Sequence, residues 1–197
     1  MTRWLSHRMV ERGIIKEEEQ ELYQFGIRNG MILLLNVVTA LVIGLLTEQL
    51  AVVAVFTLSF MVLRGYTGGY HSDSRIFCYL GSNLVLLVPV YTQAVFYKTS
   101  LAWLLAVLLV SAGIIFLLSP MHSKNRKLDK EEQKHFGRKA RLIAALELAV
   151  LGILWHAGQI PYAYAVYTGI CITALFMLVG KAQLWIQSHT EKHTENG

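Results

Sequence analysis

The sequence predicts an all-α fold, a polytopic helical bundle embedded in a membrane, with about six transmembrane or re-entrant helices and both termini in the cytoplasm. Hydrophobic residues make up 54% of the 197 residues and charged residues only 16%, whereas soluble globular domains carry about 25% charged residues. The apolar residues gather in six runs, and lysine and arginine concentrate in alternate polar stretches between them. Scarce, unevenly placed charge is typical of an integral membrane protein.

The six apolar segments cover approximately residues 27–46, 50–63, 79–97, 101–118, 140–155 and 162–179. A membrane-spanning helix needs about 20 residues. Four of the segments meet or nearly meet this length. Segment 50–63 is short, so it either spans with help from flanking residues or stops inside the membrane and lets the following residues re-enter.

Two of these segments contain a residue that interrupts the apolar pattern. Pro89 predicts a kink in segment 79–97. Glu147 lies inside segment 140–155, and acidic residues at membrane depth are costly and often functional. We expect Glu147 either to pair with a basic residue such as Arg141 or to mark a polar cavity.

The distribution of basic residues predicts the orientation. Basic residues are frequent before the first segment, present after the second and dense in the loop 119–139, which holds seven of them; the turns at 47–49 and 156–161 have none. Because cytoplasmic loops carry the excess of lysine and arginine, this alternation places the loop after segment 50–63 and the loop 119–139 on the same cytoplasmic face.

The whole chain, residues 1–197, is interpreted as a single membrane-embedded domain. Residues 1–26 mix apolar and charged side chains and predict either an interfacial amphipathic helix or a solvated helix leading into the first span. Residues 181–197 form a polar tail whose composition predicts disorder.

The stretch RGYTGGYHSDSRIFC, residues 64–78, is unusual for a junction between apolar helices. We call it the Gly-His-Cys stretch; it contains Arg64, Gly68, Gly69, His71 and Cys78. A cysteine becomes a nucleophile as its thiolate, which a nearby histidine, positive charge or a helix N-terminus favours. The residues HSDS are good N-caps, so Cys78 is expected in the first turns of the next helix.

Spacing restricts direct chemistry between His71 and Cys78. Seven residues on a straight helix rise about 10.5 Å, whereas a nucleophile and its base must come within about 2.6–3.2 Å. The pairing therefore requires a bend between His71 and Ile76. Gly68 and Gly69 either offer backbone donors to an oxyanion or form a turn, and Arg64 either stabilises an oxyanion or anchors the membrane edge.

With a second motif, LLSPMHSKNRKL, these residues resemble the accessory gene regulator B (AgrB) family of membrane cysteine endopeptidases. The first motif contributes Arg64, the glycine pair, His71 and Cys78. The second contributes Pro120 and the basic, asparagine-containing stretch Lys124, Asn125, Arg126 and Lys127. The resemblance covers nearly the whole chain, including its size and number of apolar segments.

The resemblance implies an enzyme that processes an AgrD-type quorum-sensing precursor peptide. Cys78 would be the nucleophile and His71 the general base and acid, giving an acyl-enzyme thioester that a cysteine or serine of the substrate attacks to release a thiolactone or lactone ring. The stretch 124–127 would bind the acidic C-terminal part of the precursor; ordinary topological charge explains the same residues equally well. The site would lie on the cytoplasmic side of the cell membrane.

Other readings of the chain stay open. A small exporter or permease of a signalling peptide, without thiol catalysis, also fits the apolar segments, and a purely structural membrane subunit is a third alternative.

No third catalytic partner is evident, although Asp73, Ser82 and Asn83 are near enough to consider. No cofactor or metal is expected, because His71 and Cys78 lack further ligands at zinc-site spacing. The expected partners are the precursor and the lipid bilayer, with a homodimer possible and no nucleic acid; Cys171 is expected to be a core residue.

Overall fold

A computed structural model describes residues 2–68, 75–121 and 130–195, without the side chains of some of them, residues 75–80 and 187–195 included. This part of the chain is helical and contains no strand, which confirms the predicted all-α class. Two units are distinguished, 1–39 and 40–197, with the boundary inside α2. The first contains α1 (Thr2–Glu11), a short 3-10 helix (Glu17–Glu19) and most of α2 (Gln20–Leu46).

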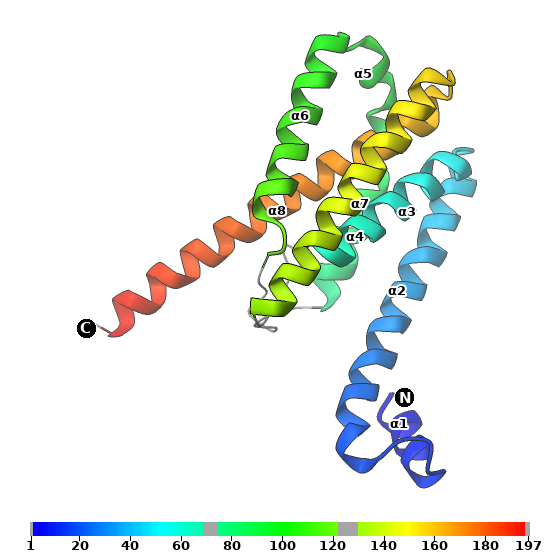
Figure 1. Ribbon diagram of the computed structural model, residues 1–197. Coiled ribbons are helices and arrows are strands. Elements are labelled where there is room, and N and C mark those ends of the chain that lie inside the picture. The colour runs from blue at the N-terminus through cyan, green and yellow to red at the C-terminus, as the bar shows by residue number, and fades with distance from the viewer. Residues whose placement is uncertain (1, 69–74, 122–129, 196–197) are drawn as a thin grey trace. The chain divides into compact units, whose positions relative to one another are not determined.

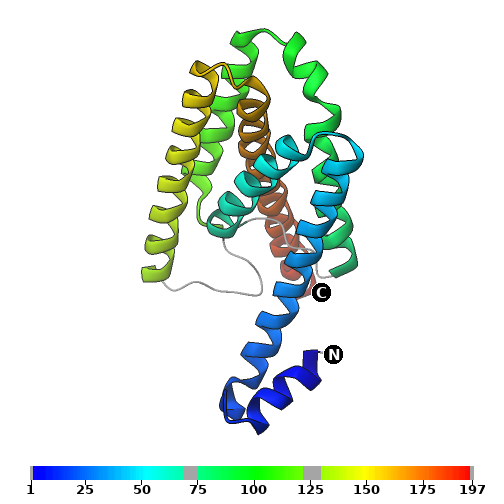
Figure 2. The same ribbon diagram turned by 90° about the vertical axis from the view of Figure 1, so that its right-hand side faces the viewer.

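The second unit begins with the end of α2 and holds the remaining helices: α3 (Leu50–Thr67), α4 (Arg75–Tyr91), α5 (Gln93–Lys98), α6 (Leu101–Leu118), α7 (Lys130–His156) and α8 (Ile160–Glu195). Helix α8 packs against α3, α6 and α7 and is the centre of this unit (Figures 1 and 2). Its buried face contributes to two apolar clusters, one around Phe56 and Tyr164 and one around Leu63 and Met177.

Four helices of the described chain are long and apolar enough to cross a membrane. They are Glu17–Leu46, Leu50–Thr67, Leu101–Leu118 and the Ile160–Ile186 part of α8. Large aliphatic and aromatic side chains cover their outer surfaces; on α6, Trp103 is 69% exposed and Leu109 72%. Contiguous apolar surface of this kind requires lipid or another apolar partner.

The prediction of one helix over residues 79–97 was wrong, because two helices cover this segment. The chain bends at Thr92, which separates α4 from α5, and neither helix is among the four candidate spans. Pro89 inside α4 has no N–H to donate, and its carbonyl accepts the Tyr164 hydroxyl at 3.0 Å. The Tyr164 hydroxyl also lies within hydrogen-bond distance of the Thr92 hydroxyl, at 2.6 Å. The Thr92 hydroxyl in turn donates to the Val88 carbonyl. Helix α8 thus adds hydrogen bonds of the Tyr164 hydroxyl next to the bend, while the Thr92 N–H still donates to the Val88 carbonyl.

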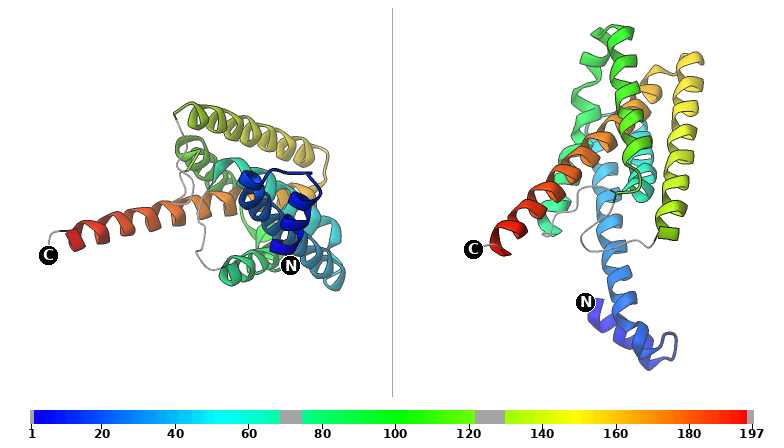
Figure 3. Two further views of the ribbon diagram at one scale, coloured as in Figure 1. Left: turned by 90° about the horizontal axis from the view of Figure 1, so that it is seen from below. Right: turned by 60° about the vertical axis from the view of Figure 1, so that its left-hand side comes forward.

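Other boundaries also differ from the predictions. Segment 50–63 is part of an 18-residue helix that continues to Thr67, so α3 has enough length to cross the membrane without re-entering. Segment 140–155 is the second half of α7, which is not among the four candidate spans. The expectation of disorder after residue 181 was wrong, because α8 continues to Glu195 and extends beyond the neighbouring helices (Figure 3).

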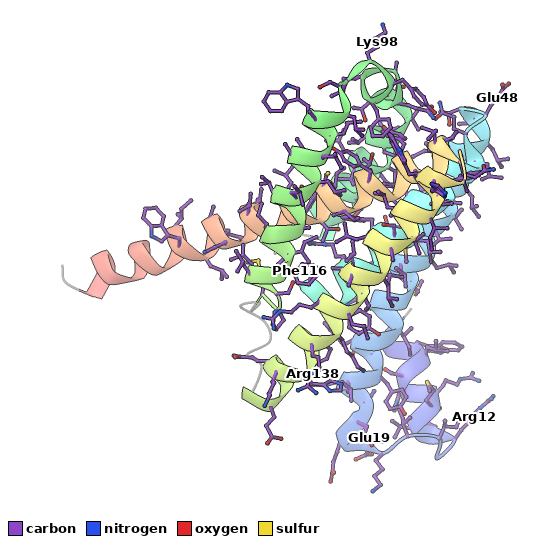
Figure 4. All side chains as sticks on the ribbon, turned by 45° about the horizontal axis from the view of Figure 1, so that its top comes forward. Arg12, Glu19, Glu48, Lys98, Phe116 and Arg138 are labelled. Atoms are coloured by element: carbon purple, nitrogen blue, oxygen red, sulfur yellow. The ribbon has the colours of Figure 1, made fainter. Side chains whose placement is uncertain are left out.

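The two ends of the second unit differ in charge and in the elements that meet there. Helices α4 and α7 begin, and α3 and α6 end, at one end of the unit, whereas the α5–α6 turn lies at the other (Figures 1 and 2). Figure 4 shows Lys98 at the α5–α6 turn and Arg138 towards the opposite end, where Lys134, Lys139 and Arg141 also lie on α7. The basic end is therefore the end at which the two sequence motifs begin.

Candidate active site

The predicted site residues fall partly inside the described structure. Arg64 belongs to the last turn of α3, and Gly68 follows that helix. Cys78 lies in the first turn of α4, which begins at Arg75. His71, Gly69 and the basic stretch 124–127 lie outside the described residues, as does the side chain of Cys78. The described part of the site is therefore formed by the ends of α3 and α6 and the start of α4.

Gly68 ends α3 in a backbone conformation that glycine adopts readily. Its φ is 73°, in the region where a Cβ atom is strained, and its N–H donates to the Arg64 carbonyl at 3.3 Å. That N–H is thus engaged in closing the helix. The geometry fits the turn role considered for this glycine.

A backbone hydrogen bond joins the two motifs at this point. The Met121 N–H donates to the Thr67 carbonyl at 2.9 Å, and Thr67 is fully buried. A Cβ atom placed on Gly68 would come within 2.7 Å of the Met121 carbonyl oxygen. The described residues that precede His71 and the basic stretch are therefore adjacent, although Thr67 and Met121 are more than fifty positions apart in sequence. We call this contact of Thr67 and Gly68 with Met121 the motif junction.

Replacing Gly68 by alanine is expected to destabilise the protein by about 1–3 kcal/mol, because the new Cβ meets both an unfavourable φ and a backbone carbonyl. For a chain of this size the midpoint of thermal unfolding in detergent micelles should fall by about 2–12 °C. Gly65→Ala is the matched control, since a Cβ there meets nothing within 4 Å. Equal midpoints for the two variants would contradict the tight contact at the motif junction.

Helix α7 is held against the same place by a second glycine. A Cβ on buried Gly137 would lie 2.9 Å from Pro120 Cδ and 3.4 Å from the Ser119 carbonyl oxygen. Only glycine lets α7 approach the chain after α6 this closely. The ends of α3 and α6 and the first turns of α7 are thus packed together at the motif junction.

Arg64 supports the end of α3. Its guanidinium Nη1 lies 3.4 Å from the Gly68 carbonyl oxygen, and the group is centred 4.9 Å above the Phe176 ring of α8. A cation over an aromatic face is attractive, and a basic side chain near a helix C-terminus stabilises its free carbonyls. This placement fits the structural role considered for Arg64.

Of the three residues considered as a third catalytic partner, Ser82 and Asn83 lie in the described structure. Asp73 lies outside the described residues. Ser82 and Asn83 lie on α4, four and five positions after Cys78. On a helix, a residue four positions on shares a face with the first, whereas the fifth is turned away by about 140°. Within the described chain, the side-chain oxygen of Asn83 is buried without a hydrogen-bond partner.

Glu147 does not pair with Arg141. The Ser59 hydroxyl on α3 donates to Glu147 Oε2 at 2.6 Å, whereas Arg141 Nε donates to the Phe116 carbonyl at 3.1 Å. The sequence pointed to Glu147, but nothing in the apolar run around Ser59 identified its partner. Among the described residues no three histidine, cysteine, aspartate or glutamate side chains gather in a group that could hold a metal.

Comparison with known proteins identifies a family. The family model described as Accessory gene regulator B matches residues 1–178. The chain is 26% identical to the accessory gene regulator protein B of Staphylococcus intermedius over 156 residues, which is 77% of this chain and 80% of the relative. No solved structure matches.

Two proteins of Clostridium perfringens show a shorter match. The chain is 24% identical over 131 residues to AgrB-like proteins of strain 13 and strain SM101. In each case the match covers 64% of this chain and 61% of the relative, which is less than two thirds of the relative's length. Together with the apolar helices, these matches indicate a membrane protein.

Proposed function

Because the chain belongs to the accessory gene regulator B family, we propose that it is a membrane-embedded cysteine endopeptidase that cleaves an AgrD-type quorum-sensing precursor peptide. In this proposal the chain crosses the membrane several times, with both termini and the site on the cytoplasmic side. Cys78 is the nucleophile and His71 is the general base and acid. The basic stretch Lys124, Asn125, Arg126 and Lys127 holds the acidic C-terminal part of the substrate.

The proposed reaction is an acyl transfer in two steps. His71 takes the thiol proton of Cys78, and the thiolate attacks the carbonyl carbon at the boundary between the signal core and the C-terminal part. The peptide C–N bond breaks, the leaving amine receives the proton from His71, and an acyl-enzyme thioester remains. A cysteine or serine side chain of the bound substrate then attacks the thioester, closes the ring and releases the Cys78 thiol. Exclusion of water favours this ring closure over hydrolysis.

The observation that carries the proposal is the motif junction. The bond from the Met121 N–H to the Thr67 carbonyl brings together the residues that precede His71 and the basic stretch, which supports a common site for the two motifs. A substrate whose cleavage point is followed by an acidic segment needs this arrangement, with the nucleophile near a basic surface. Lys134, Arg138 and Lys139 are exposed on α7 and provide positive charge for an acidic segment.

Thiol dependence can be tested with a chain that keeps a single cysteine. The sequence has two cysteines, so Cys171→Ala leaves Cys78 as the only thiol. We expect the variant, reconstituted in vesicles, to cleave a precursor whose ring-closing residue is serine, and to lose cleavage after treatment with N-ethylmaleimide. Precursor present during the treatment should protect the activity. Cleavage that survives complete alkylation would contradict the thiol mechanism.

The same experiment addresses the exporter alternative. A permease without thiol catalysis would move the precursor across the vesicle membrane uncut, and alkylation of Cys78 would leave the precursor's length unchanged. Measuring transport and cleavage in the same vesicles separates the two activities. Cleavage in detergent micelles, where no transport can occur, is expected only of the peptidase.

A further inference from the structure

A groove in the second unit is not used by the proposed reaction. It lies between α3 and α7, with Tyr162 and Val166 of α8 also in its lining, and has a volume of about 700 Å³ and mainly apolar walls. Its floor holds the hydrogen-bonded pair Ser59 and Glu147, and its walls include Ala51, Ala54, Leu58 and Val150. Leu58 is 66% exposed and Val150 46% exposed, so both sit at the rim.

The lining residues have the spacing of helix faces. On α3 the groove uses positions 51, 54, 55, 58, 59 and 62, and on α7 positions 147, 150 and 154. These are steps of three and four residues, which place each set on one face of its helix. The α3 face covers about 16 Å at a rise of about 1.5 Å per residue, the length of about three helical turns. The alanines at one end let another backbone approach closely.

Glu147 leaves one carboxylate oxygen without a protein partner. Oε2 accepts the Ser59 hydroxyl, and no bond to Oε1 exists within the described residues of this unit. Among the described residues from 40 to 197, no lysine, arginine or histidine forms an ion pair with Glu147, and the nearest candidate in sequence, Arg141, is bound to the Phe116 carbonyl. Ser59 is the tenth of the 18 residues of α3, so the pair lies at half its length. Carboxylates at such depth usually face a partner of opposite charge.

We propose that the groove between α3 and α7 binds an apolar peptide helix that carries one cationic side chain, with the cation placed against Glu147. The apolar walls and small residues match a helix surface, and the carboxylate selects a lysine or arginine on it. Ser59 positions the carboxylate by holding Oε2 and leaves Oε1 to the cation. The site is separate from Cys78 and requires no chemistry, so it is independent of the proposed cleavage.

The proposal is tested with synthetic helices in vesicles that contain the full chain. The probe is a 20-residue leucine–alanine peptide with one central lysine and a photoreactive leucine one turn away, and its counterpart has glutamine in place of lysine. We expect cross-links of the lysine peptide at α3 and α7 residues lining the groove, located by mass spectrometry. Half-saturation should need at least about tenfold more of the glutamine peptide, equivalent to about 1.4 kcal/mol.

Protein variants complete the comparison. Glu147→Gln keeps an acceptor for Ser59 but removes the charge, and it should weaken binding of the lysine peptide at least about tenfold without weakening the glutamine peptide further. Glu131→Gln, an exposed position on the same helix, is the control and should change neither. Ser59→Ala keeps the carboxylate and should keep the preference for lysine. Membrane levels and Cys78-dependent cleavage of each variant report folding separately.

Three results would overturn the inference. Equal binding of the lysine and glutamine peptides to the wild-type chain would mean that Glu147 selects no charge. Cross-links confined to surfaces outside α3 and α7 would mean that the groove holds lipid chains instead. Cross-links that only join two copies of the chain across the groove would assign it to self-association.

Discussion

Co-expression of the chain with an AgrD-type precursor is expected to yield no cleavage product when Cys78 is replaced by alanine. Removal of a catalytic nucleophile takes away the covalent pathway itself, so cleavage should fall by at least about a thousandfold, to the level found without the protein. The readout is the length of the epitope-tagged precursor on denaturing gels. The amount of variant in the membrane fraction should equal that of the wild type, because one small side chain is changed.

The matched control is Cys171→Ala. Cys171 is a free, half-buried cysteine within α8, and it is not one of the residues of the motif junction. Its replacement should leave cleavage within about twofold of the wild type, since a buried free cysteine acts as a small apolar residue. Cleavage that persists in Cys78→Ala, or that is lost equally in Cys171→Ala, would remove Cys78 from the proposed role.

The sequence predicted the helical class and the apolar segments well because both depend on local composition. Segment 101–118 coincides with α6, and segment 50–63 begins where α3 begins. The ends were predicted less well. Hydropathy falls at Arg64, but the helix continues to Thr67 because Arg64 lies over Phe176 and Gly68 closes the last turn. The contact of Arg64 with α8 supports that boundary together with the local glycine cap, and this contact cannot be read from the α3 sequence.

The bend at Thr92 has the same kind of cause. Pro89 indicated a kink, but the position at which α4 ends depends on the hydroxyl of Tyr164, which is more than seventy positions away in the chain. Ser59 was missed as the partner of Glu147 for a related reason. A serine in an apolar run carries no signal of its own, and only the packing of α7 against α3 gives it a role.

For the candidate site, the motifs predicted which residue types take part. The distribution of basic residues predicted that the two loops that carry the motifs lie on the same side of the membrane. The lysines and arginines placed both motif-bearing loops on one side, and the motif junction at Thr67 and Met121 agrees with that placement. Two residues at this point fit the structural alternatives considered for them. Gly68 closes the last turn of α3, and the Arg64 guanidinium donates to the Gly68 carbonyl, so both support the backbone that precedes His71.

Replacement of His71 by alanine is expected to lower cleavage by about 10²–10⁴-fold while leaving the protein in the membrane, because a general base contributes a factor of this size. The effect should be smaller than that of Cys78→Ala, since the thiol remains. Added imidazole should restore part of the activity of His71→Ala but none of that of Cys78→Ala. His135→Ala, an exposed histidine on α7, is the control and should cleave normally.

The comparison of the two catalytic variants is informative because His71 and Cys78 are seven positions apart. On a straight helix their side chains would be about 10.5 Å apart along the axis, too far for proton transfer. Helix α3 ends at Thr67 and the described part of α4 begins at Arg75, so His71 falls between the two described helices. Full cleavage by His71→Ala would mean that Cys78 is activated without it, leaving the dipole of α4 and nearby basic side chains as the sources of thiolate.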